Sequence, residues 1–125
     1  MRRPMPVRSL NSSVLKWPDA AAVHRAALHW AEREAPRRNG LLRLGYFGSY
    51  ARGEWGVGSD LDLIAIVEHT DTPFERRALE WDLSGLPVPA ELLVYTRAEW
   101  EEMRGRGARF PSVVEAEAVW LLGSR

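Results

Sequence analysis

The stretch from Gly48 to Asp62, GSYARGEWGVGSDLD, holds side chains that could bind phosphate. Gly48 and Ser49 directly follow the apolar run 41–47, where a strand could turn into a short helix. Glycine lets a backbone approach a ligand closely, and serine is a favoured residue at a helix N-terminus. The free N–H groups of a first helical turn attract phosphate. The sequence therefore predicts a phosphate site at Gly48 and Ser49.

A pair of carboxylates, Asp60 and Asp62, lies at the start of the apolar run 61–67. Side chains at positions i and i+2 of a strand project from the same face, and two carboxylates there repel each other unless a cation sits between them. Hard oxygen ligands in a chain without cysteine suit Mg²⁺ or Mn²⁺. Alone, a Gly-Ser pair is an ordinary turn and an Asp-x-Asp pair an ordinary solvated strand end. Together, between two apolar strands, they predict metal-assisted phosphoryl or nucleotidyl transfer.

The elements that must position these residues follow from periodicity and from helix and strand breakers. Pro18 and Asp19 open an amphipathic helix that ends at 36–40, and Thr96 and Glu99 form a capping-box pattern. The expected strands are 41–47, 61–67, 90–96 and 118–122. The expected later helices are 73–83 and 97–106. A loop is expected at 104–111, followed by a helical turn or two within 112–118. The order predicts an α/β (α+β) fold, a small mixed β-sheet with helices packed mainly on one face.

Composition bounds the class of protein. The 125 residues fit one domain, 1–125, with a possible N-terminal arm at 1–17. Seventeen basic and seventeen acidic side chains cancel, which argues against extended nucleic-acid binding. No apolar run is long enough to span a bilayer and the first residues do not form a secretory signal, so no membrane partner and a cytoplasmic location are expected.

The segment Gly48 to Leu63 resembles the signature of the nucleotidyltransferase superfamily that includes DNA polymerase β. The resemblance is nearest to the minimal nucleotidyltransferases of bacteria and archaea, written G-S-x-A-R-G, a short gap, then S-D-x-D-L. Every fixed position of that pattern is present here. By length and element order the resemblance extends over roughly residues 18 to 122 and implies a nucleotidyltransferase-like fold.

The resemblance implies a two-metal mechanism. Asp60 and Asp62 would bind both ions, and Gly48 and Ser49 would hold the β- and γ-phosphates of a nucleoside triphosphate. A hydroxyl of the acceptor would attack the α-phosphorus, and pyrophosphate would leave.

Further candidates are each weighed against a plainer role. Glu91 would be the third carboxylate, which binds the catalytic metal and can help deprotonate the nucleophile, at a position where the family commonly has aspartate; otherwise it is a solvent-facing residue of an edge strand. Arg52 would steady the triphosphate, or it would be a helix-end cation or pair with Glu54. Ser59 is a nucleotide-binding candidate that could instead cap or orient the loop before Asp60.

The resemblance implies an Mg²⁺-dependent (or Mn²⁺-dependent) enzyme that moves a nucleoside monophosphate, AMP from ATP, to a hydroxyl. Minimal proteins of this kind resemble antitoxins paired with a helical HEPN-type toxin, and the acceptor would then be a tyrosine of that partner. The alternative is a non-catalytic module that binds a nucleotide or the partner and neutralises it by contact. A third interpretation, antibiotic adenylylation, needs a drug-holding domain that is not visible here.

Overall fold

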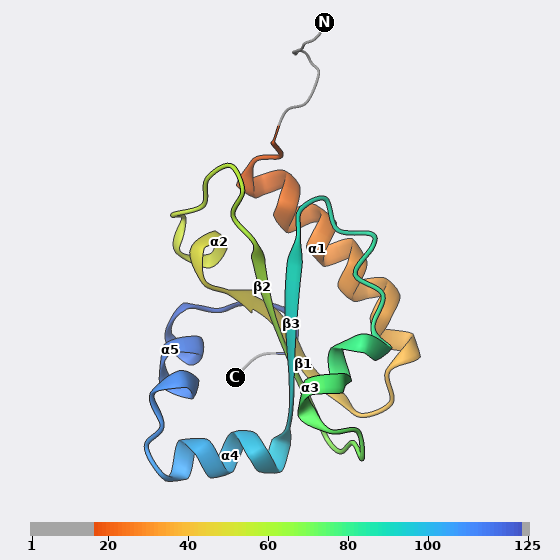
Figure 1. Ribbon diagram of the computed structural model, residues 1–125, viewed down its shortest axis with the longest axis vertical. Coiled ribbons are helices and arrows are strands. Elements are labelled where there is room, and N and C mark those ends of the chain that lie inside the picture. Colours follow the sequence, from red (N-terminus) through yellow and green to blue (C-terminus); the bar gives the residue numbers. More distant parts are fainter. Residues whose placement is uncertain (1–16, 124–125) are drawn as a thin grey trace, which may run out of the picture.

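The computed structural model describes residues 17–123, in which four strands form one mixed sheet (Figure 1). The strands are β1 (Leu41–Phe47), β2 (Leu61–Val67), β3 (Ala90–Thr96) and β4 (Val119–Leu122). Their order in the sheet is β3-β2-β1-β4. β1 pairs antiparallel with β2 and with β4, whereas β2 and β3 run parallel. The predicted mixed sheet is confirmed, and the only difference in strand bounds is that β4 begins one residue later than expected.

The described part of the chain, 17–123, also contains five α-helices and two short 3₁₀ turns. They are α1 (Ala20–Glu34), η1 (Ala35–Arg37), α2 (Ser49–Arg52), α3 (Phe74–Arg77), η2 (Ala78–Glu80), α4 (Arg97–Gly105) and α5 (Arg109–Glu117). Two expectations need correction. The helix expected over 73–83 ends at Glu80, and α5 begins inside the segment expected to be a loop.

Local contacts explain why the first of these helices ends at Glu80 and why α5 begins where it does. Trp81 leaves the helix in an extended conformation and packs against Trp30, with ring centroids 5.9 Å apart. Asp82 then accepts a hydrogen bond from the Ser84 backbone at 2.9 Å and closes a turn. In α5, Pro111 is fully buried within the first helical turn, where its missing N–H costs no hydrogen bond.

Helices cover both faces of the sheet, which differs from the expectation that they would pack mainly on one face. α1 lies on one face, where Val23, Ala27 and Trp30 join the larger hydrophobic core. α4 and α5 lie on the other, where Trp100 and Val114 form a second core (Figure 1). Side chains alternate along β2 between these two cores, so each face of the strand is buried along most of its length.

Helix starts follow the predicted caps. Asp19 accepts a hydrogen bond from the Ala22 backbone at 2.8 Å and begins α1. Thr96 and Glu99 form the complete capping box of α4, with bonds of 3.1 and 2.8 Å.

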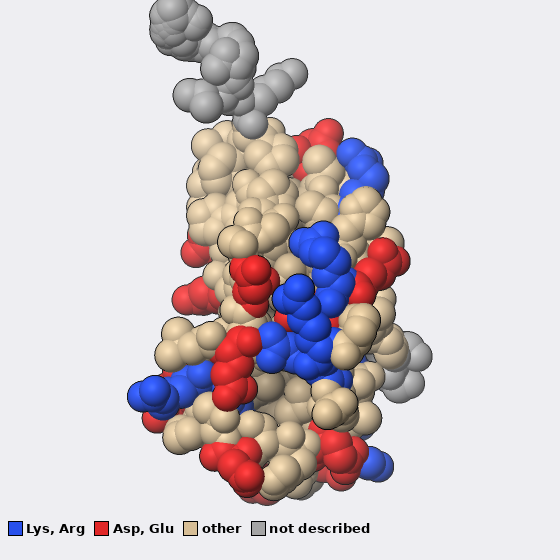
Figure 2. Space-filling view, turned by 90° about the vertical axis from the view of Figure 1, so that its right-hand side faces the viewer, with Lys and Arg blue, Asp and Glu red and all other residues tan. Residues whose placement is uncertain are grey.

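The surface around the end of α1 and α3 carries both signs of charge. Figure 2 shows basic side chains gathered at the centre of one face, with acidic side chains to either side. The contacts in this region include Arg38 with Glu34 at 3.0 Å, and Arg77 with Glu99 at 2.7 Å. Arg77 also donates to the Val94 carbonyl, so this buried guanidinium ties α3 to β3 and α4.

Within residues 17–123, no helix is long and apolar enough to cross a membrane. The arm expected at 1–17 lies outside the described residues, apart from Trp17. Its indole Nε1 donates a hydrogen bond to the Tyr50 hydroxyl at 3.0 Å, which places the start of the described chain beside α2.

Candidate active site

Sheet register brings two of the predicted carboxylates, Asp62 and Glu91, to one end and one face of the sheet. Asp62 is paired across the parallel β2–β3 ladder with Glu91, and across the antiparallel β1–β2 ladder with Phe47. Their neighbours Leu61 and Leu92 point into the core beneath α1, so Asp62 and Glu91 face the opposite side. Asp60 precedes Asp62 by two residues and is exposed at the same end. The three predicted carboxylates therefore lie at the same end of the sheet.

Gly48 brings the turn after β1 against Asp62. Its backbone has φ 78° and ψ −152°, a conformation that is essentially restricted to glycine. A Cβ atom at this position would clash with Oδ2 of Asp62. The glycine therefore serves two purposes, because it allows the turn into α2 and leaves room for a carboxylate above the backbone.

Asp62 has an unusual electrostatic environment. Burial raises the pKa of the Asp62 carboxyl above its ordinary value, and the negative charges of Glu91 and Asp60 raise it further. Arg52 opposes this shift, and Glu117 adds to it. Within residues 17–123 neither Asp60, Asp62 nor Glu91 forms an ion pair. Arg52 therefore offsets only part of the repulsion among these carboxylates, and the pKa of Asp62 stays above its ordinary value.

A further acidic residue, Glu117, reaches the same place from the end of α5. Its Oε2 accepts a hydrogen bond from the Gly48 backbone N–H at 2.7 Å. Arg52 Nη1 lies 3.4 Å from the same carboxylate. The contact spans 69 positions of sequence, and no local pattern around Glu117 signals it, so it was missed from the sequence.

The remaining candidates occupy different parts of the turn and loop. Arg52 forms the predicted ion pair with Glu54 at 2.8 Å in addition to its contact with Glu117. Ser59 accepts a hydrogen bond from the Gly56 backbone at 2.8 Å, so its hydroxyl holds the loop before Asp60. The Ser49 hydroxyl makes no hydrogen bond within residues 17–123. Of these polar groups, Ser49 is the one whose side chain is not already engaged.

This geometry agrees with a comparison against protein-family models. Residues 28–121, most of the chain, match the model of the nucleotidyltransferase domain. The chain belongs to the nucleotidyltransferase domain family. Among curated proteins, no significant sequence match to this nucleotidyltransferase domain is found.

Solved structures share the nucleotidyltransferase fold at low sequence identity. A Sulfolobus solfataricus protein proposed to be a nucleotidyltransferase is 18% identical, with a TM-score of 0.57 over 81% of this chain and 80% of that one. A toxin–antitoxin structure with AMP-PNP is 17% identical, with a TM-score of 0.52 over 81% and 73%. A point mutant of the toxin–antitoxin MntA-HpeT is 19% identical, with a TM-score of 0.51 over 82% and 73%. At these identities the likeness establishes the fold.

The donor set of this nucleotidyltransferase domain fits a divalent cation. Asp60, Asp62 and Glu91 would offer hard oxygen ligands from one end of the sheet, and the space above Gly48 admits the Asp62 carboxylate. Within residues 17–123, no group of three carboxylate or imidazole side chains is arranged so that it could hold a metal ion. Binding a cation here would thus require Asp60 and Glu91, both exposed, to turn toward Asp62.

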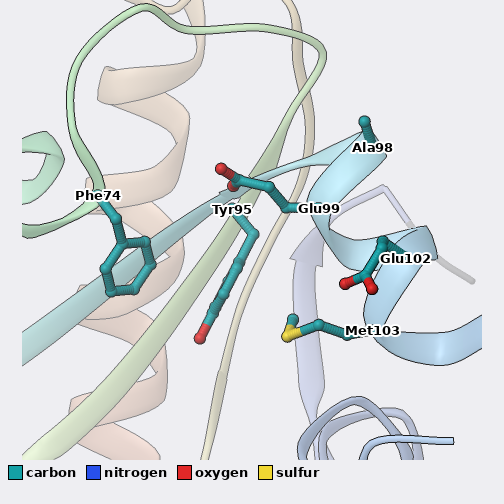
Figure 3. Close-up of a pocket in the computed structure, with 6 residues that line it drawn as sticks. All are labelled: Phe74, Tyr95, Ala98, Glu99, Glu102 and Met103. Atoms are coloured by element: carbon teal, nitrogen blue, oxygen red, sulfur yellow. The ribbon is translucent and has the colours of Figure 1, made fainter. Parts of the chain in front are cut away.

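An apolar cavity of about 490 Å³ lies away from these carboxylates (Figure 3). Phe74 and Tyr95 line it side by side, with ring centroids 5.0 Å apart, and Met103 of α4 lines it on the other side of Tyr95. Tyr95 stands at the carboxyl end of β3, whereas Glu91 stands at its start. None of the candidate site residues lines this cavity.

Proposed function

We propose that the chain is an Mg²⁺-dependent nucleotidyltransferase that transfers AMP from ATP to an acceptor hydroxyl. The observation that carries the proposal is the juxtaposition of Asp60, Asp62 and Glu91 beside the Gly48 turn, in a chain that belongs to the nucleotidyltransferase domain family. Several carboxylates beside a phosphate-binding turn form the arrangement that metal-assisted phosphoryl and nucleotidyl transfer require.

Each residue has a role in this proposal. Asp60 and Asp62 would hold the cation, whose charge would offset that of the triphosphate and of the transition state. The Gly48 amide and the Ser49 hydroxyl hold phosphate oxygens, and Arg52 steadies them. Glu91 accepts the proton of the acceptor hydroxyl as the new oxygen–phosphorus bond forms at the α-phosphate. The bond to the β-phosphate breaks, and pyrophosphate leaves with the electron pair.

The proposed acceptor is a tyrosine of a HEPN-type toxin, for which this chain would be the antitoxin. Support comes from the toxin–antitoxin structures that share its fold, including the one with AMP-PNP. The rival proposal is a non-catalytic module that neutralises such a toxin by contact. The replacement of the family's usual aspartate by Glu91 is the feature that favours it, because the longer side chain holds a catalytic cation less closely.

A transfer assay separates the proposals. The chain is incubated with Mg²⁺, the product of the neighbouring gene and ATP labelled at either the α- or the γ-phosphate. The enzyme attaches only the α-label to the partner, and Asp62→Asn attaches none. Neutralisation of the partner without any attached label would establish the contact mechanism instead.

A further inference from the structure

We propose that the Glu117 carboxylate occupies the position of a phosphate oxygen in the proposed nucleotide site, so that a polyphosphate must displace it to bind. This inference rests on the proposed function, because it concerns regulation of the same site. Glu117 is the last residue of α5, and its Oε2 lies 2.7 Å from the Gly48 amide nitrogen.

Glu117 engages two of the three groups that the proposed site offers to phosphate, the Gly48 amide and Arg52. The Gly48 N–H donates to its carboxylate, and Arg52 Nη1 lies 3.4 Å from it. Carboxylate and phosphate oxygens are both anionic acceptors, and backbone amides and arginine bind either. A phosphate at the Gly48 amide and the Glu117 carboxylate are therefore mutually exclusive.

The position of Glu117 makes its contact replaceable. A negative charge is disfavoured at the carboxyl end of a helix, where the helix dipole is also negative. Asp62 adds a second negative charge nearby. The Gly48 amide and Arg52 offset this repulsion, so an anion that competes for them also releases Glu117 from an unfavourable place.

The rest of α5 is anchored independently of Glu117. Glu115 bonds Arg43 through both carboxylate oxygens, at 2.8 and 3.0 Å, and accepts from the Trp100 indole at 3.1 Å. Val114 is fully buried in the core beneath α4 and α5. The Glu117 side chain, 17% exposed at the surface, can turn outward while the helix stays in place.

The chain provides a matched control in Glu54. It also pairs with Arg52, at 2.8 Å, but the Gly48 amide donates to Glu117 and not to Glu54. Glu54→Gln and Glu117→Gln remove the same charge and loosen the same arginine. Only Glu117→Gln removes the charge from the side chain that competes with phosphate for the Gly48 amide.

Tripolyphosphate is titrated by calorimetry, in Mg²⁺, into the full chain and the variants Glu117→Gln, Glu117→Ala and Glu54→Gln. We expect both Glu117 variants to bind it about tenfold more tightly than the unsubstituted chain, because a charged hydrogen bond no longer has to be broken. Glu54→Gln should change the affinity by less than about twofold, as is usual for an exposed pair. Thermal melts confirm that the variants are folded.

The amide resonance of Gly48 provides a second measurement. It should shift on Glu117 substitution, and shift again when tripolyphosphate is added. Equal or weaker binding by both Glu117 variants, or no binding by any variant, overturns the inference. A different result would refute the proposed function itself. That result is transfer of the AMP label by Asp62→Asn at the rate of the unsubstituted chain.

Discussion

Substituting Gly48 by alanine should destabilise the protein more than the same change at Gly53, five residues later. Gly53 has φ 76° and ψ 19°, with no atom within 4 Å of an added Cβ. A left-handed non-glycine residue of this kind costs about 1 kcal/mol. Gly48 has φ 78° and ψ −152°, a conformation that costs other residues about 2 kcal/mol. Its Cβ would also displace the Asp62 carboxylate, which adds about 1 kcal/mol.

Gly48→Ala should therefore lower the free energy of unfolding by about 3 kcal/mol, against about 1 kcal/mol for Gly53→Ala. Urea denaturation at neutral pH measures both, and the melting temperature should fall by about 4 °C for each kcal/mol. In the background of Asp62→Ala, the cost of Gly48→Ala should drop by about 1 kcal/mol because the clash is gone. Equal costs at Gly48 and Gly53, or no dependence on Asp62, would refute the close approach of this carboxylate to the turn.

Three further predictions concern Asp62, Glu99 and the binding of ATP. Asp62→Asn should raise the stability of the metal-free chain by about 1 kcal/mol at pH 7, since the raised pKa of Asp62 means that its ionised form opposes folding; a large loss of stability in a thermal melt would make Asp62 a structural residue. Arg77 lowers the pKa of Glu99 to about 2, so their pairing stabilises the fold above pH 4.5 and is lost as the pH falls toward 2. The melting temperature of Glu99→Gln should consequently fall less steeply than that of the unsubstituted chain between these values, and parallel slopes would contradict this. ATP binding followed by calorimetry should weaken in EDTA and in Ser49→Ala, and unchanged affinity in both would argue against a cation-bridged triphosphate.

Most of the fold could be predicted from the sequence because its signals are local. The strands 41–47, 61–67 and 90–96 are apolar runs between breakers, and the structure has them at those bounds. The beginning of α5 was missed because Ala108 at its N-cap makes no side-chain hydrogen bond and the preceding segment contains glycines. Burial of Pro111 and Val114 against the sheet holds this helix, and such tertiary contacts are not encoded by periodicity.

The placement of the carboxylates was partly predictable, and their electrostatic partners were not. The spacing of Asp60 and Asp62 predicts a common face, but the juxtaposition of Asp62 and Glu91 depends on the parallel register of β2 and β3. Glu117 reaches Gly48 only because α5 folds back over the sheet. The hydrogen bond between Glu117 and Gly48 depends on how the whole of α5 packs against the sheet. A motif of adjacent residues carries no information about such packing.

We propose that a divalent cation and a triphosphate bind together at the Asp62 end of the sheet. A crystal of the chain grown with Mn²⁺ and a non-hydrolysable ATP analogue tests it most directly, because Mn²⁺ is located by its anomalous scattering. We expect an Mn²⁺ peak bound by Asp60, Asp62 and Glu91, with phosphate oxygens at the Gly48 amide. An Mn²⁺ peak elsewhere, or a triphosphate bound away from Gly48, would contradict it.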